Sequence, residues 1–388
     1  MLSVELFAGA GGLAIGMANV GFRHAAVVEW DQYACETFRQ NQQHHSPQVE
    51  GWPVYQTDAR IFDFKQISSD IAVVSGGPPC QPFSMGGKHQ AQDDARNMFP
   101  EAVRAIRELM PRAFIFENVK GLTRESFASY FSYIHLQLQY PEIERLSSEE
   151  WMQHRNRLEQ HHSSNRGAPT YNVLFDVLNA ADYGVPQKRE RVFFVGFRSD
   201  LGAQWHFPKK THSAAELLKS KWITGEYWTE HKISKRMRPT ATSKQQAELA
   251  KHFTTENTSL LRWKTTRDAL IGLPDPEVFP ANNIINHIFT PGAKSYVGHT
   301  GSLLDEPAKT LKAGHHGVPG GENMFIKDNG AVRYFTLREA ARLQTFPDSY
   351  EFHGSWSQAM RQLGNAVPVK LAEVVAGSVA ESLLALQS

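Results

Sequence analysis

Apolar runs and amphipathic stretches alternate through the first half of the chain. Short apolar runs at residues 3–7, 24–28, 71–75 and 113–116 have the length and composition of strands buried on both faces of a sheet. Residues 97–110 lie between the last two runs and carry apolar side chains at helical spacing. This alternation predicts an α/β fold with a mostly parallel sheet whose strands are joined through crossover helices.

The pattern changes near the middle of the chain. In residues 201–332 glycine and proline become frequent, and tryptophan and tyrosine appear among basic side chains, with 17 Lys and Arg against 12 Asp and Glu. Such a surface suits contact with a nucleic-acid backbone, and an ordinary solvated face explains it equally well. Thr336 and Glu339 then form a capping box that starts a further helix. We expect a catalytic and cofactor-binding domain at 1–200, a smaller irregular domain at 201–332 and a C-terminal segment at 333–388.

A proline-rich turn follows the apolar run at 71–75. Its sequence is GGPPCQPFS, so that Cys80 stands among three prolines that fix φ and remove backbone donors. The turn lies at the carboxyl end of a predicted parallel strand, which is the edge where open α/β sheets bind ligands. Taken alone, the turn leaves two interpretations of Cys80 open, a nucleophile and a buried packing residue.

A carboxylate ends the next predicted strand. Glu117 follows the apolar run at 113–116, and the helix between the two strands brings Glu117 to the same sheet edge as Cys80. A thiol beside a carboxyl group suits addition to an electron-poor ring, in which sulfur attacks carbon while the acid protonates a ring nitrogen. The pair therefore favours a nucleophile at Cys80.

A glycine turn follows the first predicted strand and opens a helix. Gly9 and Gly11 permit a tight turn and close approach of a ligand to the helix amino terminus. Glu29 ends the second strand, twenty residues after Gly9, where a carboxylate holds a ribose hydroxyl in nicotinamide and in S-adenosylmethionine sites alike. This loop leaves the cofactor open between the two.

Taken together, these residues resemble the DNA (cytosine-5)-methyltransferase family of bacterial or phage type. The resemblance implies a Rossmann-like S-adenosylmethionine-dependent methyltransferase domain with a mostly parallel sheet. It also implies that the smaller irregular domain is a target-recognition domain and that the C-terminal segment returns to the catalytic domain. Six family motifs stand in the family's order, at Phe7–Gly12 (FAGAGG), Gly77–Gln81 (GPPCQ), Glu117–Val119 (ENV), Gln187–Arg191 (QKRER), Thr336–Pro347 and Gly364–Val367 (GNAV).

The resemblance implies S-adenosylmethionine as the methyl donor. It places Phe7 against the adenine, Glu29 on the ribose, Trp30 beside the ring, Asp58 near the adenine amine and Asn365 at the amino-acid end. For Asp58 a cap at the end of a strand is the alternative. The other expected cofactor-binding residues are Gly9, Gly11, Gly12, Pro79 and Ala366.

The implied chemistry is covalent catalysis on a cytosine flipped out of the duplex. A Cys80 thiolate adds to carbon 6 while a protonated Glu117 donates to ring nitrogen 3, and carbon 5 then takes the methyl group. Arg189 and Arg191 are expected on one face at the start of a strand, where guanidinium groups bind a phosphate or the exocyclic oxygen of a base. Either arginine, or a helix amino terminus, is expected to lower the pKa of Cys80.

The expected substrate is double-stranded DNA with a short specific site. Ser84 and Lys88 are candidate phosphate contacts on the polar loop after Cys80, although a solvated lysine is a reasonable alternative for Lys88. Thr310 lies in a segment that resembles the family's Thr-Leu element, and we expect it to hold the strand beside the displaced base. A cognate restriction endonuclease or defence-system proteins are possible partners.

Length and composition restrict the class of protein further. The 388 residues carry a formal charge of +1 and contain no apolar run long enough to span a membrane. Cys35 and Cys80 are the two cysteines, which indicates a reducing compartment. We expect a cytoplasmic protein associated with the nucleoid, and no membrane partner. No metal is expected, because the His pairs at 44–45 and 161–162 have no cysteine or carboxylate at ligand spacing.

Three other functions explain part of the sequence. A transfer-RNA cytosine-5 methyltransferase would share the chemistry but would carry a compact recognition region. A catalytically silent DNA-binding relative would typically lack the nucleophile. A nicotinamide dehydrogenase explains residues 3–29 and nothing after Cys80.

Overall fold

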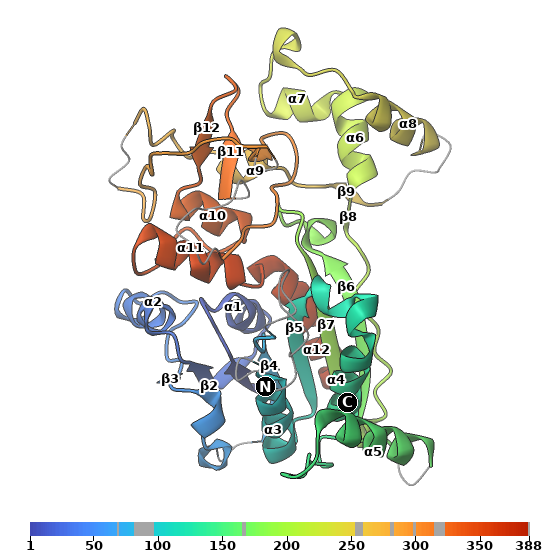
Figure 1. Ribbon diagram of the computed structural model, residues 1–388. Helices are drawn as coiled ribbons and strands as arrows, with labels where there is room; N and C mark the ends of the chain where they lie inside the picture. The colour runs from blue at the N-terminus through green and yellow to red at the C-terminus, as the bar shows by residue number, and fades with distance from the viewer. Residues whose placement is uncertain are drawn as a thin grey trace. The chain divides into compact units, whose positions relative to one another are not determined.

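The structure is a computed structural model, and the chain divides into two compact units (Figure 1). Unit 1 contains residues 1–178, 190–208 and 372–388, and unit 2 contains residues 179–189 and 209–371. The structure describes residues 1–67, 70–80, 97–164, 168–252, 259–279, 283–297, 300–313 and 323–386.

A seven-stranded sheet forms the centre of unit 1, in the order β3-β2-β1-β4-β5-β7-β6. The first five strands pair in parallel, and β7 runs antiparallel to β5. The α/β class with a mostly parallel sheet, predicted from the sequence, is confirmed. The strands are β1 (Leu2–Leu6), β2 (Arg23–Glu29), β3 (Val54–Gln56), β4 (Ile71–Gly76), β5 (Ala113–Val119), β6 (Tyr171–Asn179) and β7 (Glu190–Arg198).

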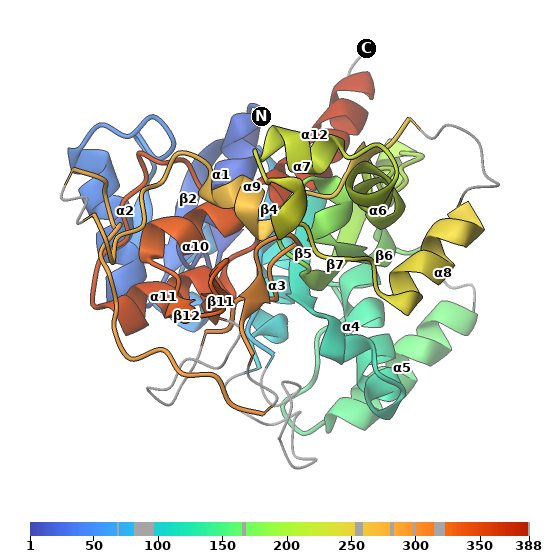
Figure 2. The ribbon, with the colours of Figure 1, turned by 90° about the horizontal axis from the view of Figure 1, so that it is seen from above.

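Helices cover both faces of this sheet. Figure 2 shows α1 and α12 on one face and α3 and α4 on the other. A Cβ atom added at Gly377 of α12 would lie 3.5 Å from Cγ1 of Val20, the residue that follows α1, so these helices pack together. The helices are α1 (Gly12–Asn19), α2 (Gln32–Gln43), α3 (Phe99–Leu109), α4 (Ala128–Gln139), α5 (Trp151–Ser163) and α12 (Val369–Ala385), the last beginning in unit 2.

Aromatic packing fills the core of unit 1. All residues of β4 are buried, as are all but the last residue of β5. Gly196 of β7 lies against the ring of Phe114, where a Cβ atom would come within 2.3 Å of the ring carbons. Glycine is therefore required at position 196, because any side chain would displace the phenylalanine from the sheet interior.

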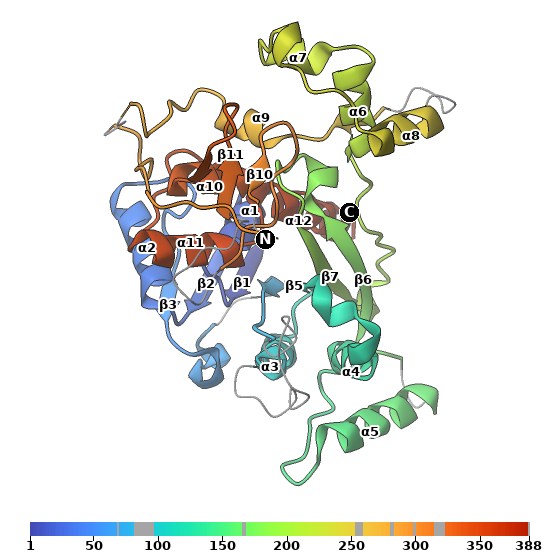
Figure 3. The same cartoon turned by 45° about the horizontal axis from the view of Figure 1, so that its top comes forward.

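Unit 2 contains short strands and short helices. Figure 3 shows α6, α7 and α8 grouped together, and Leu217, Tyr227 and Trp228 form a small hydrophobic core there. Its strands are β8 (His212–Ser213), β9 (Leu261–Arg262), β10 (Ser302–Leu303), β11 (Met324–Ile326) and β12 (Val332–Tyr334). Its helices are α6 (Ala214–Trp222), α7 (Glu226–Glu230), α8 (Ser243–His252), α9 (Thr266–Leu270), α10 (Leu337–Leu343) and α11 (Trp356–Asn365).

The division differs from the expected domain limits in three places. Residues 201–208 belong to unit 1, residues 179–189 and 333–371 belong to unit 2, and the return of the chain to unit 1 begins at Ala372. Gln187 provides the physical reason, because its side chain donates to the carbonyl of Leu343 at 3.2 Å and accepts from the amide of Leu311 at 3.0 Å. In the described part of the chain no helix is long and apolar enough to cross a membrane.

Candidate active site

Cys80 lies just beyond the carboxyl end of β4. The chain leaves the strand at Gly76 and reaches Cys80 through Gly77, Pro78 and Pro79. The amide of Met98 donates to the carbonyl of Pro79 at 2.9 Å, and Cys80 forms an isolated antiparallel bridge with Asn97. The thiol is therefore held on a turn that is fixed from both sides, and its side chain is 7% exposed.

Burial sets the protonation of this thiol. Desolvation raises the pKa of Cys80 well above its usual range. The sequence predicts a lowered pKa from Arg189, Arg191 or a helix amino terminus, but burial shifts the pKa of Cys80 in the opposite direction. The physical reason is that loss of water disfavours the thiolate, while both arginines are bound to other partners.

Glu117 lies at the end of β5 and is 6% exposed. Its Oε1 atom is 2.8 Å from Nε of Arg191 in β7. A Cβ atom added at Gly77 would lie 3.5 Å from Oε2 of Glu117, so the turn before Cys80 passes close over the carboxylate. The side chain of Asn118 donates to the carbonyl of Pro78 at 2.9 Å and ties the end of β5 to the same turn. The predicted sheet edge that carries Cys80 and Glu117 is present in unit 1.

The two arginines of the QKRER motif hold different partners. Burial lowers the pKa of Arg191, and the charge of Glu117 opposes this. Arg189 is fully buried in unit 2, where its guanidinium donates to the carbonyls of Leu311 at 3.2 Å and Gly364 at 2.7 Å. Alternate spacing along a strand predicted one common face, but the strand begins at Glu190, so Arg189 lies outside it.

The glycine turn and Glu29 meet at the carboxyl ends of β1 and β2. Phe7, Gly9 and Gly11 have φ values of 55°, 54° and 85°, and Gly11 caps α1, whose first residue is Gly12. Glu29 Oε2 accepts from the amide of Gly9 at 2.7 Å, and Oε1 accepts from the amide of Trp30 at 2.8 Å. Burial raises the pKa of Glu29, and these bonds oppose the rise. The turn, the helix amino terminus and the carboxylate thus form one polar edge.

Four other residues were predicted to bind the cofactor, and they lie in different surroundings. The Trp30 side chain is 72% exposed. Asp58 caps the start of the short 3-10 helix Ala59–Ile61, two residues after the end of β3, and its carboxylate pairs with Arg60, which lowers the pKa of Asp58. Asn365 and Ala366 end α11 in unit 2, where Asn365 is exposed and the Ala366 amide donates to Gln362 at 3.0 Å.

A family model settles the classification of the chain. Residues 1–140 and 151–381 match the model of C-5 cytosine-specific DNA methylases. The chain belongs to this family. It is a DNA (cytosine-5)-methyltransferase, and the family and fold imply S-adenosylmethionine as its methyl donor.

Two curated relatives are similar in sequence to this C-5 cytosine methylase over nearly its whole length. M.PspPI, a Type II methyltransferase of Psychrobacter sp. (strain TA137), is 31% identical over 98% of this chain and 79% of its own length. M.NgoMIV, a Type II methyltransferase of Neisseria gonorrhoeae, is 27% identical over 98% of this chain and 97% of its own length.

Solved structures confirm the fold of this methylase. A DNA modification methyltransferase encoded within an Escherichia coli prophage has a TM-score of 0.60 and 23% identity, over 99% of both chains. The Spodoptera frugiperda DNMT2 structure has a TM-score of 0.57 and 15% identity, over 100% of this chain and 99% of its own.

The predicted DNA contacts of the methylase fall partly within the described residues. Ser84 and Lys88 lie in residues 81–96, outside the described part. Thr310 lies in unit 2, where its hydroxyl donates to the carbonyl of Lys188 at 2.6 Å. The amide of Lys188 in turn donates to the carbonyl of Ala308 at 2.8 Å. The Thr-Leu segment is therefore bound to the QKRER motif.

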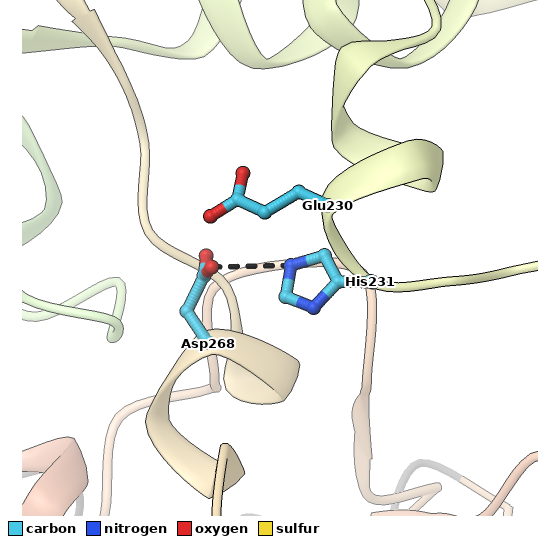
Figure 4. Close-up of side chains that lie close together, drawn as sticks. All are labelled: Glu230, His231 and Asp268. Atoms are coloured by element: carbon cyan, nitrogen blue, oxygen red, sulfur yellow. Dashed lines mark ion pairs between the residues drawn. The ribbon is translucent and has the colours of Figure 1, made fainter.

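One group of three potential metal ligands occurs among the described residues of the methylase. Glu230, His231 and Asp268 place their ligand atoms within 4.8 Å of one another (Figure 4). Arg262 donates to both oxygens of Asp268, at 2.8 and 2.9 Å, and to Glu230 at 2.7 Å. This guanidinium already supplies the positive charge between the carboxylates, so we expect no metal here. Of the paired histidines, His162 bonds the hydroxyl of Tyr140 at 2.8 Å.

Sequence reasoning missed Asn97, which pairs with Cys80, and Tyr130, which binds the side chain of Asn97. Asn97 precedes α3, and its backbone pairs with Cys80. The side chain of Asn97 donates to the hydroxyl of Tyr130 in α4. No local pattern marks either residue, because the contacts join positions 17 and 33 residues apart along the chain.

Proposed function

We propose that the enzyme methylates carbon 5 of a cytosine flipped out of a short, specific duplex DNA site, through a covalent bond between Cys80 and carbon 6. The observation that carries this proposal is the fixed turn of Cys80 at the end of β4, which passes close over Glu117 at the end of β5. The Cys80 sulfur would then approach the face of the cytosine ring, while the Glu117 carboxyl group would approach the ring edge that carries nitrogen 3.

Flipping is required because carbon 6 is inaccessible within a paired and stacked base. Extrusion of the nucleotide costs on the order of a few kcal/mol, and contacts to the flipped base and to the phosphates offset this cost. The buried surroundings of Cys80 and Glu117 favour the reaction, because electrostatic interactions strengthen where water is excluded.

The bonding changes balance as follows. The Cys80 thiolate forms a bond to carbon 6, and the electrons of the double bond between carbons 5 and 6 form a double bond between carbons 4 and 5. The electrons of the double bond between carbon 4 and nitrogen 3 move to nitrogen 3, which takes a proton from Glu117. When bound, S-adenosylmethionine would supply the methyl group to carbon 5 and leave as S-adenosylhomocysteine. Loss of the carbon 5 proton to a base such as water expels the sulfur, and nitrogen 3 returns its proton to Glu117. Arg191 faces the exocyclic oxygen of the base in this arrangement.

Glu117 must be protonated when it donates. The guanidinium of Arg191 lies 2.8 Å from the Glu117 carboxyl group, and its positive charge favours the ionised form of that group. We infer that entry of the base draws Arg191 toward the exocyclic oxygen and further excludes water, which lets the carboxyl group take up a proton.

The residues of the glycine turn fit the methyl donor. Glu29 is held in place by backbone amides and retains acceptor capacity for ribose hydroxyls. Phe7, Gly9, Gly11 and Gly12 would hold the adenosine and amino-acid portions at the amino terminus of α1, with Trp30 beside the ring. Asp58, Pro79, Asn365 and Ala366 complete the proposed cofactor-binding set. Metal chemistry has no part in this proposal.

Unit 2 would recognise the DNA, with Thr310 beside the displaced base and Arg189 holding the Thr-Leu and GNAV segments in place. Ser84 and Lys88 would contact phosphates. We propose a restriction-modification role, with a cognate endonuclease or defence-system proteins as partners, in the cytoplasm near the nucleoid. The Type II names of the relatives support this role.

Transfer of a labelled methyl group to duplex DNA tests the proposal, with bisulfite sequencing to locate the product. Cys80→Ser is expected to abolish transfer. Cys35→Ser is the matched control because Cys35 is the other buried cysteine and, among the described residues, its thiol bonds only a backbone carbonyl, that of Glu29. Duplex carrying 5-fluorocytosine at the target should become covalently attached to the Cys35→Ser protein and not to Cys80→Ser. Methylation by Cys80→Ser would exclude the covalent mechanism, and transfer to transfer RNA in place of DNA would exclude the substrate.

A further inference from the structure

A lysine is buried among the short helices of unit 2. Lys221 lies near the end of α6, four residues after Leu217 of the small hydrophobic core, so the two side chains share one face of the helix. The Lys221 side chain is 1% exposed, and its ammonium group lies 5.3 Å from the ring centre of Tyr227. A buried ammonium group is costly unless it is paired, so its partners explain why a lysine stands at this position.

Both hydrogen-bond partners of this ammonium group lie in the segment that leads to Thr310. Lys221 Nζ donates to the carbonyl of Asp305 and, at 3.0 Å, to Oε1 of Glu306. The carboxylate of Asp305 accepts from the hydroxyl of Tyr227 in α7 at 2.8 Å. Helices α6 and α7 therefore hold residues 305–306 through both backbone and side-chain oxygens.

Helix α9 binds the backbone of the same segment. The amide of Thr266 donates to the carbonyl of Glu306 at 2.8 Å, and the amide of Arg267 donates to the carbonyl of Leu304 at 2.7 Å. These bonds do not involve the Glu306 side chain, which Lys221 holds. Loss of the Lys221 ammonium group should therefore loosen the segment without releasing it.

The Glu306 carboxylate links Lys221 to the surroundings of Thr310. Glu306 Oε2 lies 3.9 Å from Nζ of Lys188, while Oε1 binds Lys221. Thr310 follows four residues after Glu306, and its hydroxyl donates to the carbonyl of Lys188 at 2.6 Å. Both the chain itself and the Lys188 contact thus connect the buried lysine to Thr310.

We propose that Lys221 is a positioning residue for DNA, which acts through Glu306 to set the place of Thr310 beside the displaced base. This inference rests on the proposed function, in which Thr310 holds the strand at that place. Because its side chain is buried, Lys221 would not contact DNA itself, and its effect would reach the substrate through Thr310.

Steady-state kinetics of methyl transfer test the inference. Lys221→Met keeps a long unbranched side chain and removes the ammonium group. We expect KM for duplex DNA to rise about tenfold, the loss of one hydrogen bond to a charged phosphate, while kcat and the KM for S-adenosylmethionine stay within about twofold of wild type. Lys219→Met is the matched control and should change none of the three constants, because Lys219 lies in the same helix with a side chain that is 41% exposed and paired with Glu216 at 3.5 Å.

A second change at Thr310 separates positioning from general support of the fold. Thr310→Val removes the hydroxyl and should itself raise KM for duplex DNA about tenfold. In that background Lys221→Met should change KM by less than about twofold, because the contact through which it acts is already lost. Independent, additive effects of the two changes would overturn the inference.

A double variant addresses the charge that Lys221→Met leaves unpaired. Combining Lys221→Met with Glu306→Gln removes both charges of the pair, so that no buried charge loses its partner. We expect this double variant to fold and to show the same rise in KM for duplex DNA as Lys221→Met. A wild-type KM for duplex DNA in the folded double variant would overturn the inference.

Hydrogen exchange of the free protein measures the positioning without any substrate. Peptides that cover residues 304–312 should exchange faster in Lys221→Met and in the double variant than in wild type and Lys219→Met. Unchanged exchange in these peptides would overturn the inference. Failure of the proposed function is distinguishable, because faster exchange together with a wild-type KM for duplex DNA in Thr310→Val would support the positioning and contradict the proposed role of Thr310.

Discussion

Arg191 Nε lies 2.8 Å from Oε1 of Glu117, with side chains that are 13% and 8% exposed. The antiparallel register of β5 and β7 pairs Val119 with Arg191, so Glu117 is the diagonal neighbour on the same face. A buried pair of this kind is destabilising to break, because the remaining partner is left charged and without water. The ion pair therefore links the stability of the central sheet to the proposed acid.

Arg191→Ala should therefore affect both stability and activity. We expect a loss of about 3 kcal/mol in the free energy of unfolding, measured by urea denaturation, together with loss of methyl transfer. Lys120→Ala is the control. Lys120 follows β5 and forms an ion pair at 2.8 Å with Glu190 at the start of β7, but both of these side chains are about half exposed. That change should cost less than about 1 kcal/mol. Equal costs for the two variants would contradict the structural argument.

Glu117→Gln separates proton donation from packing. The amide keeps the shape of the carboxyl group but is a far weaker acid, so we expect methyl transfer to fall by about 100-fold or more. Binding of S-adenosylmethionine, followed by calorimetry, should not change, because Glu117 is absent from the proposed cofactor set. A variant that retains full methyl transfer would exclude Glu117 as the donor.

Arg189→Ala should destabilise unit 2. The change removes the donors to the carbonyls of Leu311 and Gly364, two buried groups, and we expect a loss of roughly 3 kcal/mol in the free energy of unfolding. Arg155→Ala is the comparison, since Arg155 pairs with Glu159 on the surface of α5, and its loss should cost less than about 1 kcal/mol. The measurement is urea denaturation followed by tryptophan fluorescence. An unchanged midpoint for Arg189→Ala would contradict the contacts.

Glu5 and His24 should give unfolding a defined pH dependence. Burial raises the pKa of Glu5 from 4.5 to about 8, so its contribution to stability is fully present below pH 4.5 and is lost as pH rises through about 8. Burial lowers the pKa of His24 from 6.5 to about 4, so its contribution is present above pH 6.5 and is lost as pH falls through about 4. Glu5→Gln keeps an acceptor for the hydroxyl of Ser75. This variant should not show the decrease in the free energy of unfolding at alkaline pH, which is on the order of 4 kcal/mol in the wild type. Urea denaturation between pH 5 and 9 measures the free energy of unfolding, and the same dependence on pH in wild type and variant would exclude this role of Glu5.

Two helical glycines should respond in opposite ways to alanine. A Cβ atom at Gly364 would come within 2.4 Å of the Ala313 amide nitrogen, which is backbone, so Gly364→Ala should destabilise unit 2 by about 2 kcal/mol. At Gly377 the nearest atom is 3.5 Å away, and Gly377→Ala should be neutral or stabilise α12 by about 0.5 kcal/mol. Thermal unfolding checks both. A reversed order of the two midpoints would contradict the packing.

Some elements of the site were predictable because their signals are local. The turn that carries Cys80 follows from its prolines, and the strand before Glu117 follows from its apolar run. The capping box of Thr336 and Glu339 appears as predicted, with the side chain of each bonding the backbone amide of the other. In each case the physical cause lies within a few residues of the feature.

The sequence by itself determined the α/β class, the parallel strands and the family, because hydrophobic periodicity and motif order are properties of short stretches. Only the tertiary structure decided that Arg189 and Arg191 bind different partners and that the backbone of Asn97 pairs with that of Cys80. It also decided the protonation of Cys80, because burial depends on which distant segments cover the sulfur. Contacts between residues far apart in the chain are fixed by packing, and the spacing of residues along the chain does not specify them.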